Sequence, residues 1–436
     1  MGPSIKKLGL LFILLDNLFV PVKLGFDFRA HYIFYLLFIL YYIVVCRSVR
    51  FRASYFLSIA GFFLILNLIP IINGSGYVGS LRQTGLIIFN LTFAYFLINA
   101  YKFEIQRIFA DYIQLIYFAA IVGFIQLGSQ ITGFRYGADY SYLGFDMQNF
   151  NMGIWRMQSW FQEPSFLAIA FTPVAFVGIS RLFNLTQMIS VQKSVIVIVA
   201  LMLSQSSVGL VGLLLSLIIV ITNKYSILKS PLIAMGSFLI FLFVSIAFYS
   251  IPLVKLRVDD TFGLFFDANV TAEDIENANL STYSMYSNFK VTQAAVKDKP
   301  ILGSGLGSYE TNYFKYVKHV LPKNRITEIY ALNERDANSM LLRISAELGL
   351  LGILLLAWFI YRNRITLSFK RNMQLEIDYW VINNAIFVIF LVRLLRQGHY
   401  TMLGFMVFVL IYFYSKEQFK SLQKNVLDSD SLQTST

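Results

Sequence analysis

Residues 338–361 read NSMLLRISAELGLLGILLLAWFIY, and this run decides the fold class. A membrane-spanning helix needs about 20 predominantly apolar residues. This run meets that length with only two charged side chains, Arg343 and Glu347. The whole chain of 436 residues is 57% hydrophobic and 14% charged, whereas soluble domains are about 45–50% apolar. The sequence therefore predicts an all-α polytopic membrane protein.

The same length criterion predicts about twelve transmembrane helices, because comparable apolar runs recur along the chain. Most Lys and Arg residues lie in the short loops on one side of these runs. The positive-inside rule therefore places both termini in the cytoplasm. The expected spans lie near residues 8–22, 31–46, 53–72, 83–100, 110–128, 165–181, 191–205, 207–222, 232–251, 338–361, 379–395 and 398–414.

Two long loops fall on the opposite, outer side of the predicted membrane, over residues 129–164 and 252–337. The first is aromatic and polar, which is typical of an interfacial segment. The second lies between spans 9 and 10, and structureless loops longer than about 15 residues are usually functional or disordered. The predicted domains are a bundle of spans 1–9 over 1–251, the large loop over 252–337, spans 10–12 over 338–414 and a cytoplasmic tail over 415–436.

The charge distribution excludes nucleic acid as a partner. The formal net charge is +12, but the large loop holds ten Lys or Arg against eleven Asp or Glu. The excess lies in the short loops, where it orients a membrane protein instead of following a phosphate backbone. A single cysteine, Cys46, cannot form an internal disulfide, and the three histidines show no metal-ligand spacing.

The first outer loop ends in RMQSWFQEPS, which places Arg156 seven residues before Glu163. One interpretation is an aromatic interfacial loop that ends in a helix start at Pro164. The functional interpretation is that Arg156 holds a phosphate through its fork of donors. Glu163 would then be a carboxylate at the membrane surface that acts as a base.

The large loop carries three further candidates. Arg257 is an interfacial anchor or, with other outer arginines, a second pyrophosphate ligand. Lys290 lies on a predicted amphipathic helix that begins near Ser281, where it either faces the site or is simply solvated. The segment GSGLG, residues 303–307, is a weak signal, because glycines often serve only to turn the chain.

Further candidates are the charged residues that lie within or beside the last predicted spans. Arg343 and Glu347 lie one helical turn apart, so a structural ion pair satisfies both, and this interpretation is favoured over a functional one. Arg393, Arg396 and His399 line the outer end of the last helical pair, where the histidine is a candidate proton carrier.

The order of these motifs resembles a known family, the O-antigen polymerase and ligase superfamily. The likeness rests on RMQSWFQEPS, on PILGSGLGSY before span 10 and on ANSMLLRISAELGLLG, and it covers about a quarter of the chain in motif. It implies a glycosyltransferase of the GT-C type in the bacterial inner membrane, without metal or cofactor and with its active site facing the periplasm. Arg156 and Arg257 match the outer-loop arginines that hold the diphosphate in this family.

The resemblance also implies the substrates and partners. These are an undecaprenyl-diphosphate-linked glycan as donor and as acceptor, membrane lipid and a chain-length regulator protein. The residues expected to bind the substrate are Arg156, Arg257, Lys290, Asn338, Arg343, Arg396 and His399. Glu163 is the leading candidate for the base.

One departure from the family pattern concerns the helix after the large loop. Ligases of this superfamily usually have His-Asn there, with the histidine as proposed base, whereas this chain has Asp336-Ala337-Asn338. The missing histidine favours a polymerase over a ligase, and Asp336 is a possible substitute. Ligase stays the first alternative, and a polysaccharide flippase is the second, although flippases keep their loops short.

Overall fold

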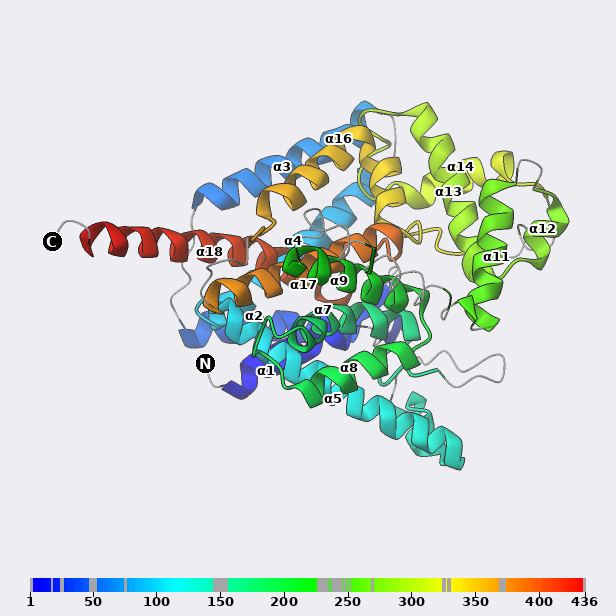
Figure 1. The fold of residues 1–436 in the computed structure, drawn as a ribbon. Coiled ribbons are helices and arrows are strands. Elements are labelled where there is room, and N and C mark those ends of the chain that lie inside the picture. The colour runs from blue at the N-terminus through cyan, green and yellow to red at the C-terminus, as the bar shows by residue number, and fades with distance from the viewer. Residues whose placement is uncertain are drawn as a thin grey trace.

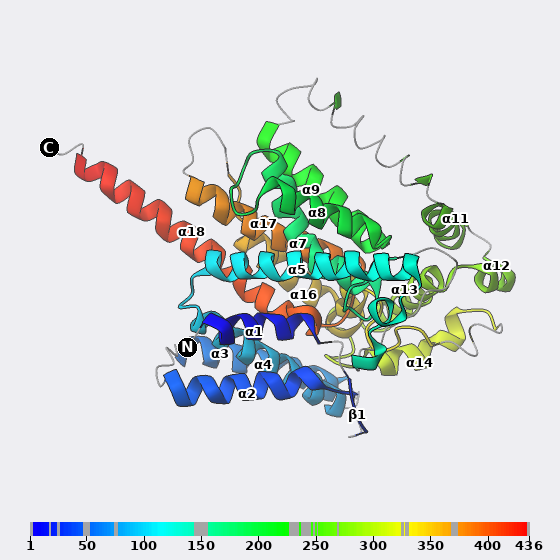
Figure 2. The same ribbon diagram turned by 90° about the horizontal axis from the view of Figure 1, so that it is seen from below.

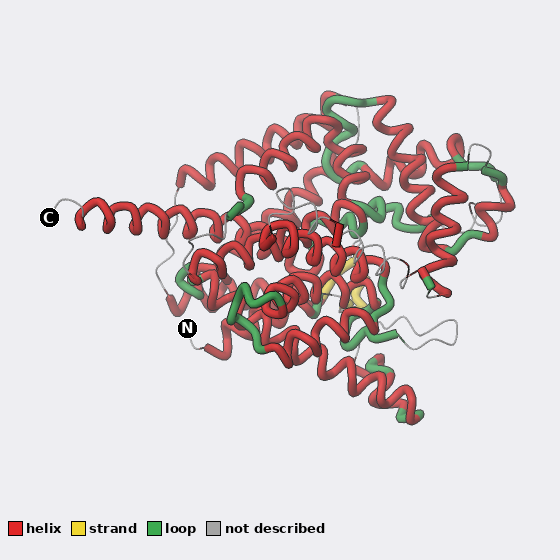
Figure 3. The backbone as a smooth tube through the Cα atoms, viewed as in Figure 1, coloured by secondary structure: helices red, strands yellow, loops and turns green. Residues whose placement is uncertain are grey.

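The fold is helical, with one two-stranded ribbon near the N-terminus (Figures 1 and 3). The predicted helical character is therefore confirmed outside that ribbon. The computed structural model describes residues 3–16, 19–23, 27–46, 53–73, 77–143, 156–225, 235–236, 246, 249–250, 252–267, 270–323, 327, 331–367 and 374–433.

The described elements are mostly helices. They are α1 (Pro3–Leu14), β1 (Phe19–Lys23), β2 (Asp27–Arg29), α2 (Ala30–Cys46), α3 (Ala53–Ile72), α4 (Tyr77–Ala100), α5 (Ile105–Thr132), α6 (Arg135–Ala138), η1 (Ser141–Leu143), α7 (Pro164–Leu182), α8 (Val191–Leu203), α9 (Ser207–Tyr225), α11 (Pro252–Phe266), α12 (Ala272–Asn277), α13 (Leu280–Asp298), α14 (Tyr309–Val320), α16 (Met340–Asn363), α17 (Gln374–Leu395), η3 (Met402–Gly404) and α18 (Phe405–Gln433).

Six of the described helices are long and apolar enough to cross a membrane: α4, α5, α7, α9, α16 and α17. Three shorter apolar helical segments, His31–Val45, Gly61–Ile72 and Val191–Leu203, fall within other expected spans. The ninth expected span, residues 232–251, lies almost entirely outside the described residues. The chain is thus a membrane protein by helix length and composition, and the number twelve stays a prediction.

The first expected span, residues 8–22, is wrong as a continuous helix. Helix α1 ends at Leu14, and an antiparallel ribbon follows in which Phe19 lies opposite Arg29. The buried carboxylate of Asp16 accepts a hydrogen bond from the backbone N–H of Leu403. This contact with a distant segment draws the chain into the protein and prevents the helix from continuing.

The tenth expected span is broken at Gly349, where the backbone has φ 60°. The glycine turn of the large loop packs into the break, because Leu350 N–H donates to the Pro300 carbonyl at 2.9 Å and Gly305 N–H donates to the Glu347 carbonyl at 2.7 Å. A side chain at Gly303 would clash with the backbone of Glu347. The glycines therefore allow two backbones to meet, which favours a structural role for GSGLG.

Helices α7 and α17 form the centre of the bundle. They pack against each other, and α7 also packs against α8 and α9. The rings of Phe176 and Trp380 lie 5.8 Å apart at the contact, and Trp380 is fully buried. These two helices are apolar around most of their surface, as expected for helices buried in the core of a bundle.

Helices α11 to α14 of the large loop gather at one end of the bundle, whereas α1 begins and α18 ends toward the opposite end (Figures 1 and 2). They have an apolar cluster of their own, which includes Ile275, Tyr283, Val291 and Tyr309. The helix predicted from Ser281 is α13, and its N-cap is Asn279, whose side chain accepts from Ser281 N–H.

The last helix starts later than expected. Residues 397–404 form a turn in which Gln397 and Leu403 have positive φ, and α18 begins only at Phe405. A side chain at Gly398 would clash with the carbonyl of Asp336. The turn therefore packs tightly against the end of the large loop, and this contact positions His399.

Candidate active site

Three arginines from separate segments form one electropositive group, called here the arginine cluster: Arg156, Arg257 and Arg396. Arg156 precedes α7, Arg257 lies on α11 and Arg396 follows α17. The Nε of Arg156 donates to the Ser204 carbonyl at 3.2 Å, which fixes its position. Burial, with a smaller contribution from the Arg257 guanidinium, lowers the pKa of Arg156 to about 10.

Arg396 completes the cluster from the other side. Its Nη1 donates to the Ser281 carbonyl of α13 at 3.3 Å. Burial lowers the pKa of Arg396, and Arg257 contributes to this shift, whereas Glu163 and Asp336 oppose it. Burial also lowers the pKa of Arg257, and its buried Nε has no hydrogen-bond partner among the described residues. The cluster thus concentrates positive charge that an anion would stabilise.

Glu163 lies among these arginines. It occupies the N-cap position of α7, but its side chain makes no capping hydrogen bond. Instead its Oε2 accepts from the hydroxyl of Ser165 at 2.8 Å, and its charge raises the pKa values of Arg156 and Arg396. The structure therefore brings together the four residues that the sequence proposed for the reacting centre, and their chemical roles stay predictions.

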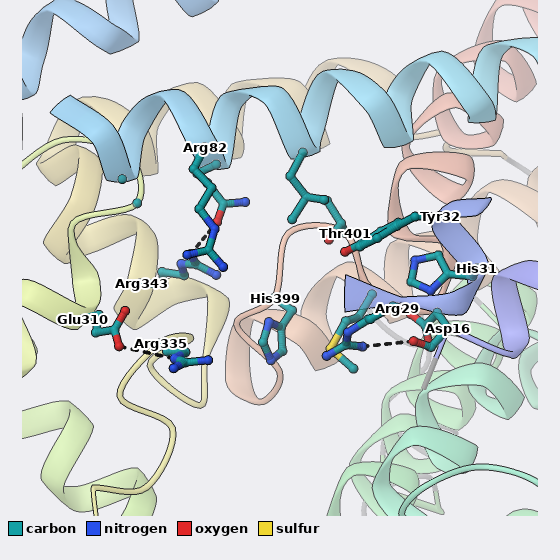
Figure 4. A pocket seen from close by; sticks show the side chains of 15 residues that line it. Asp16, Arg29, His31, Tyr32, Arg82, Glu310, Arg335, Arg343, His399 and Thr401 are labelled. Carbon is teal, nitrogen blue, oxygen red and sulfur yellow. Dashed lines mark hydrogen bonds and ion pairs between the residues drawn. The ribbon is translucent and has the colours of Figure 1, made fainter. Parts of the chain in front are cut away.

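The structure also contains a cavity of about 660 Å³, whose lining includes none of these four residues (Figure 4). Its walls come from the N-terminal ribbon, the starts of α2 and α4, the large loop, α16 and the turn before α18. The residues that line it are Asp16, Arg29, His31, Tyr32, Gly79, Arg82, Gln83, Leu86, Gly307, Glu310, Arg335, Arg343, His399, Thr401 and Met402.

Arg343 and Glu347 form a buried ion pair at the edge of the cavity, with Nε and Oε1 3.0 Å apart. The other two guanidinium nitrogens donate to the Gly398 carbonyl at 3.1 Å and to Gln83 Oε1 at 2.9 Å. Glu347 Oε2 accepts from the Tyr400 hydroxyl at 2.9 Å. Every nitrogen of Arg343 is thus engaged within the protein, which supports the structural interpretation.

His399 meets Asp336 across the tight contact at Gly398, with Nε2 and Oδ2 3.3 Å apart. The other carboxylate oxygen of Asp336 accepts from the side chain of Asn333 at 3.0 Å and from the Asn338 N–H at 3.2 Å. About 35% of the His399 side chain is accessible, and this part faces the cavity.

The protonation of His399 follows from its surroundings. Its pKa is lowered to about 4, and the largest cause is partial burial of the imidazole. Asp336 raises the pKa, while Arg29, Arg343 and Arg393 lower it. The imidazole is therefore neutral at neutral pH, and a nitrogen is available to accept a proton.

Residues 194–357 match the family model described as O-antigen ligase. The match covers 164 of the 436 residues and is consistent with the O-antigen polymerase and ligase superfamily, which the sequence resembles. No curated protein and no solved structure gave a match. Members of this superfamily are membrane enzymes of the glycosyltransferase kind, and they comprise both polymerases and ligases.

The superfamily match covers only part of the candidate site. It includes Arg257 and Asp336, whereas Arg156, Arg396 and His399 lie outside it. His399 contacts Asp336, and Arg156 and Arg396 interact with Arg257, only because the fold brings these segments together. The match therefore supports the family without assigning the roles of these three side chains.

The side chains of two other candidates make no contact with the arginine cluster among the described residues. Lys290 has its Nζ 5.2 Å from the Tyr286 ring on its own helix, and it does not line the cavity. Asn338 is buried, and its side-chain nitrogen has no hydrogen-bond partner among the described residues. Their binding roles stay predictions.

Sequence reasoning missed three cationic residues that line the cavity: Arg29, Arg82 and Arg335. Arg82 lies within α4, and an ionisable residue inside an apolar helix is a functional hypothesis by default. That signal was present in the sequence. The expected span began at residue 83, however, so Arg82 fell just outside it.

Proposed function

We propose that the chain polymerises undecaprenyl-diphosphate-linked oligosaccharide repeats into O-antigen or a related surface polysaccharide. The reaction takes place at the periplasmic face of the bacterial inner membrane. The observation that carries this proposal is the arginine cluster, in which three cations from separate segments meet around Glu163. The superfamily match supports a polymerase or a ligase over the flippase alternative.

The chemistry required of the site is glycosyl transfer. A hydroxyl of the incoming lipid-linked repeat attacks the anomeric carbon of the growing polymer, and the bond from that carbon to the diphosphate oxygen breaks. Undecaprenyl diphosphate leaves with the electron pair of the broken bond. Arg156, Arg257 and Arg396 stabilise the negative charge that develops on it, and because these guanidinium groups supply the positive charge, the proposed mechanism uses no metal ion.

His399 is the proposed base that takes the proton of the attacking hydroxyl. With its ring proton on Nε2, toward Asp336, the other ring nitrogen is the acceptor, and the side chain opens to the cavity. Glu163, the base predicted from the sequence, lies beside Arg156 and Arg396 and is the alternative. If His399 is the base instead of the Glu163 carboxylate, the base brings no negative charge near the departing diphosphate.

The pH dependence of transfer separates these two bases. His399 cannot accept a proton once it is protonated, so the rate falls as the pH falls through about 4. Asp336→Asn removes the charge that raises this pKa, and we expect the acid limb of the pH–rate profile to move to lower pH. Arg29→Gln removes a cation that lowers it, so the limb should move upward. A limb that neither substitution moves would exclude His399 and favour Glu163.

A ligase is the second candidate, and one observation favours it. The pair of His399 and Asp336 places a histidine beside the position where ligases carry theirs, although it comes from another segment. The sequence argument for a polymerase, which rested on the missing histidine, is weaker for that reason.

Purified full-length protein in lipid nanodiscs tests the proposal. Lipid-linked repeat is supplied as the sole glycan, so that each molecule serves as donor or as acceptor. We expect products that grow by whole repeats. Lipid A core is added in a parallel reaction, because a ligase requires that acceptor and a polymerase does not.

A further inference from the structure

We propose that Gln126 is a positioning residue of the diphosphate site: its side-chain amide holds the segment that carries Arg156 against α5. This inference rests on the proposed function, in which the Arg156 guanidinium binds the departing diphosphate. It adds a residue that acts through Arg156 instead of contacting the substrate. Gln126 is fully buried and lies near the end of α5 that leads into residues 129–164.

The side chain of Gln126 joins the beginning and the end of that loop. Its Oε1 accepts from the backbone N–H of Ser159 at 2.8 Å and from that of Gln158 at 3.3 Å. Its Nε2 donates to the Ala138 carbonyl at 3.2 Å. Backbone N–H groups only donate and a carbonyl only accepts, so these three partners fix the orientation of the amide. An apolar side chain of the same size would make none of these hydrogen bonds.

The two N–H groups that Gln126 accepts from belong to a non-helical segment. Gln158 and Ser159 are both buried, and Ser159 has φ 55°. A buried backbone N–H group without a partner is costly, above all in a membrane protein, where water does not replace the lost hydrogen bond. The amide of Gln126 therefore stabilises this particular path of the backbone.

Two further contacts hold the same segment on the same face of α5. The Ser159 hydroxyl donates to the Ala119 carbonyl at 2.9 Å. Met157 is fully buried and packs against Gly123, where an added side chain would approach the Met157 Sδ to 2.7 Å. Positions 119, 123 and 126 follow the spacing of one helical face. The three contacts thus form one continuous seat for residues 157–159.

This seat determines where Arg156 lies, because Arg156 directly precedes the seated residues. The Arg156 Nε donates to the Ser204 carbonyl at 3.2 Å, and the Met157 N–H donates to the Leu203 carbonyl at 3.0 Å. These contacts hold the segment to the end of α8, and Gln126 holds it to α5. A misplacement of about 1 Å can cost an enzyme about 100-fold in rate. Gln126 therefore affects the diphosphate site without contacting it.

A double-mutant cycle tests whether Gln126 acts through Arg156. Binding of farnesyl diphosphate is measured on the full-length protein in nanodiscs for wild type, Gln126→Leu, Arg156→Ala and the double variant. We expect Gln126→Leu to weaken binding by about tenfold, because two buried N–H groups lose their acceptor. It should have no further effect once Arg156 is absent. Hydrogen exchange of a peptide that spans residues 157–162 should be faster in Gln126→Leu.

Gln114→Leu is the matched control on the same helix. Gln114 is exposed, and its Oε1 accepts from the Lys193 Nζ at 2.9 Å. Its replacement should change neither the binding of farnesyl diphosphate nor the exchange of residues 157–162. If Gln126→Leu does not fold, Gly123→Ala takes its place in the cycle, because the added methyl group would displace Met157 from the same seat.

Equal losses of affinity from Gln126→Leu in the presence and in the absence of Arg156 would overturn the inference, because Gln126 would then act on the fold as a whole. Wild-type affinity or unchanged exchange in Gln126→Leu would also overturn it, and weaker binding by Arg156→Ala would leave the proposed function standing. If Arg156→Ala binds farnesyl diphosphate as wild type does, the diphosphate role itself fails and the inference fails with it.

Discussion

Arg156→Ala is expected to abolish the polysaccharide ladder and to lower the rate of glycosyl transfer by at least about 100-fold, as loss of one charge-stabilising donor does in other enzymes. The guanidinium donates to the Ser204 and Gln205 carbonyls and interacts electrostatically with Arg257 and Glu163. Its removal leaves the departing diphosphate with less positive charge at the moment when charge develops. The ladder is measured on gels of polysaccharide from cells that carry only the variant.

Two further variants test whether the effect is specific to the guanidinium of Arg156. Arg156→Lys keeps the charge but loses the fork of donors, so we expect partial activity. Arg107→Ala removes an arginine from an exposed pair with Glu104 and should retain the full ladder. Membrane abundance of each variant is measured in parallel. A full ladder from Arg156→Ala at wild-type abundance would contradict the diphosphate role.

Glu347→Ala is expected to destabilise the fold by about 3–5 kcal/mol, because it leaves the buried guanidinium of Arg343 without its counter-charge. The same carboxylate accepts hydrogen bonds from the Tyr400 hydroxyl at 2.9 Å and from the Tyr309 N–H at 3.3 Å. One substitution therefore breaks contacts among α16, α14 and the turn before α18. Unfolding of the purified protein in detergent, followed by loss of helical signal, measures the effect.

An exposed ion pair provides the control for this second prediction. Lys420 and Glu417 lie 3.0 Å apart on α18, with about half of each side chain exposed. Glu417→Ala should change the free energy of unfolding by less than about 1 kcal/mol. If Glu347→Ala is as stable as Glu417→Ala, the pair of Arg343 and Glu347 has no structural role.

The helices that could be predicted are those whose signal is local. Apolar runs such as 165–181 and 379–395 became α7 and α17, since length and hydropathy are sufficient to predict a span. The first span failed because Asp16 bonds to Leu403, a contact that no local pattern shows. The break at Gly349 depends in the same way on the glycine turn of a different segment.

The candidate site was predictable in its residue types and less so in its pairings. Arg156, Glu163, Arg257 and Arg396 were proposed from the sequence, and the structure places them in one group. The pair of His399 and Asp336 could not be predicted, because it forms only where the turn at Gly398 packs against the large loop. The cavity was missed for the same reason, since its walls come from segments far apart in the chain.

The most direct test of the central claim is the amount of undecaprenyl diphosphate released for each glycosidic bond formed when purified protein receives lipid-linked repeat as the only glycan. The account predicts one molecule released per bond, together with products that lengthen by whole repeats. Absence of lengthened product under these conditions, with transfer appearing only after lipid A core is added, would contradict it.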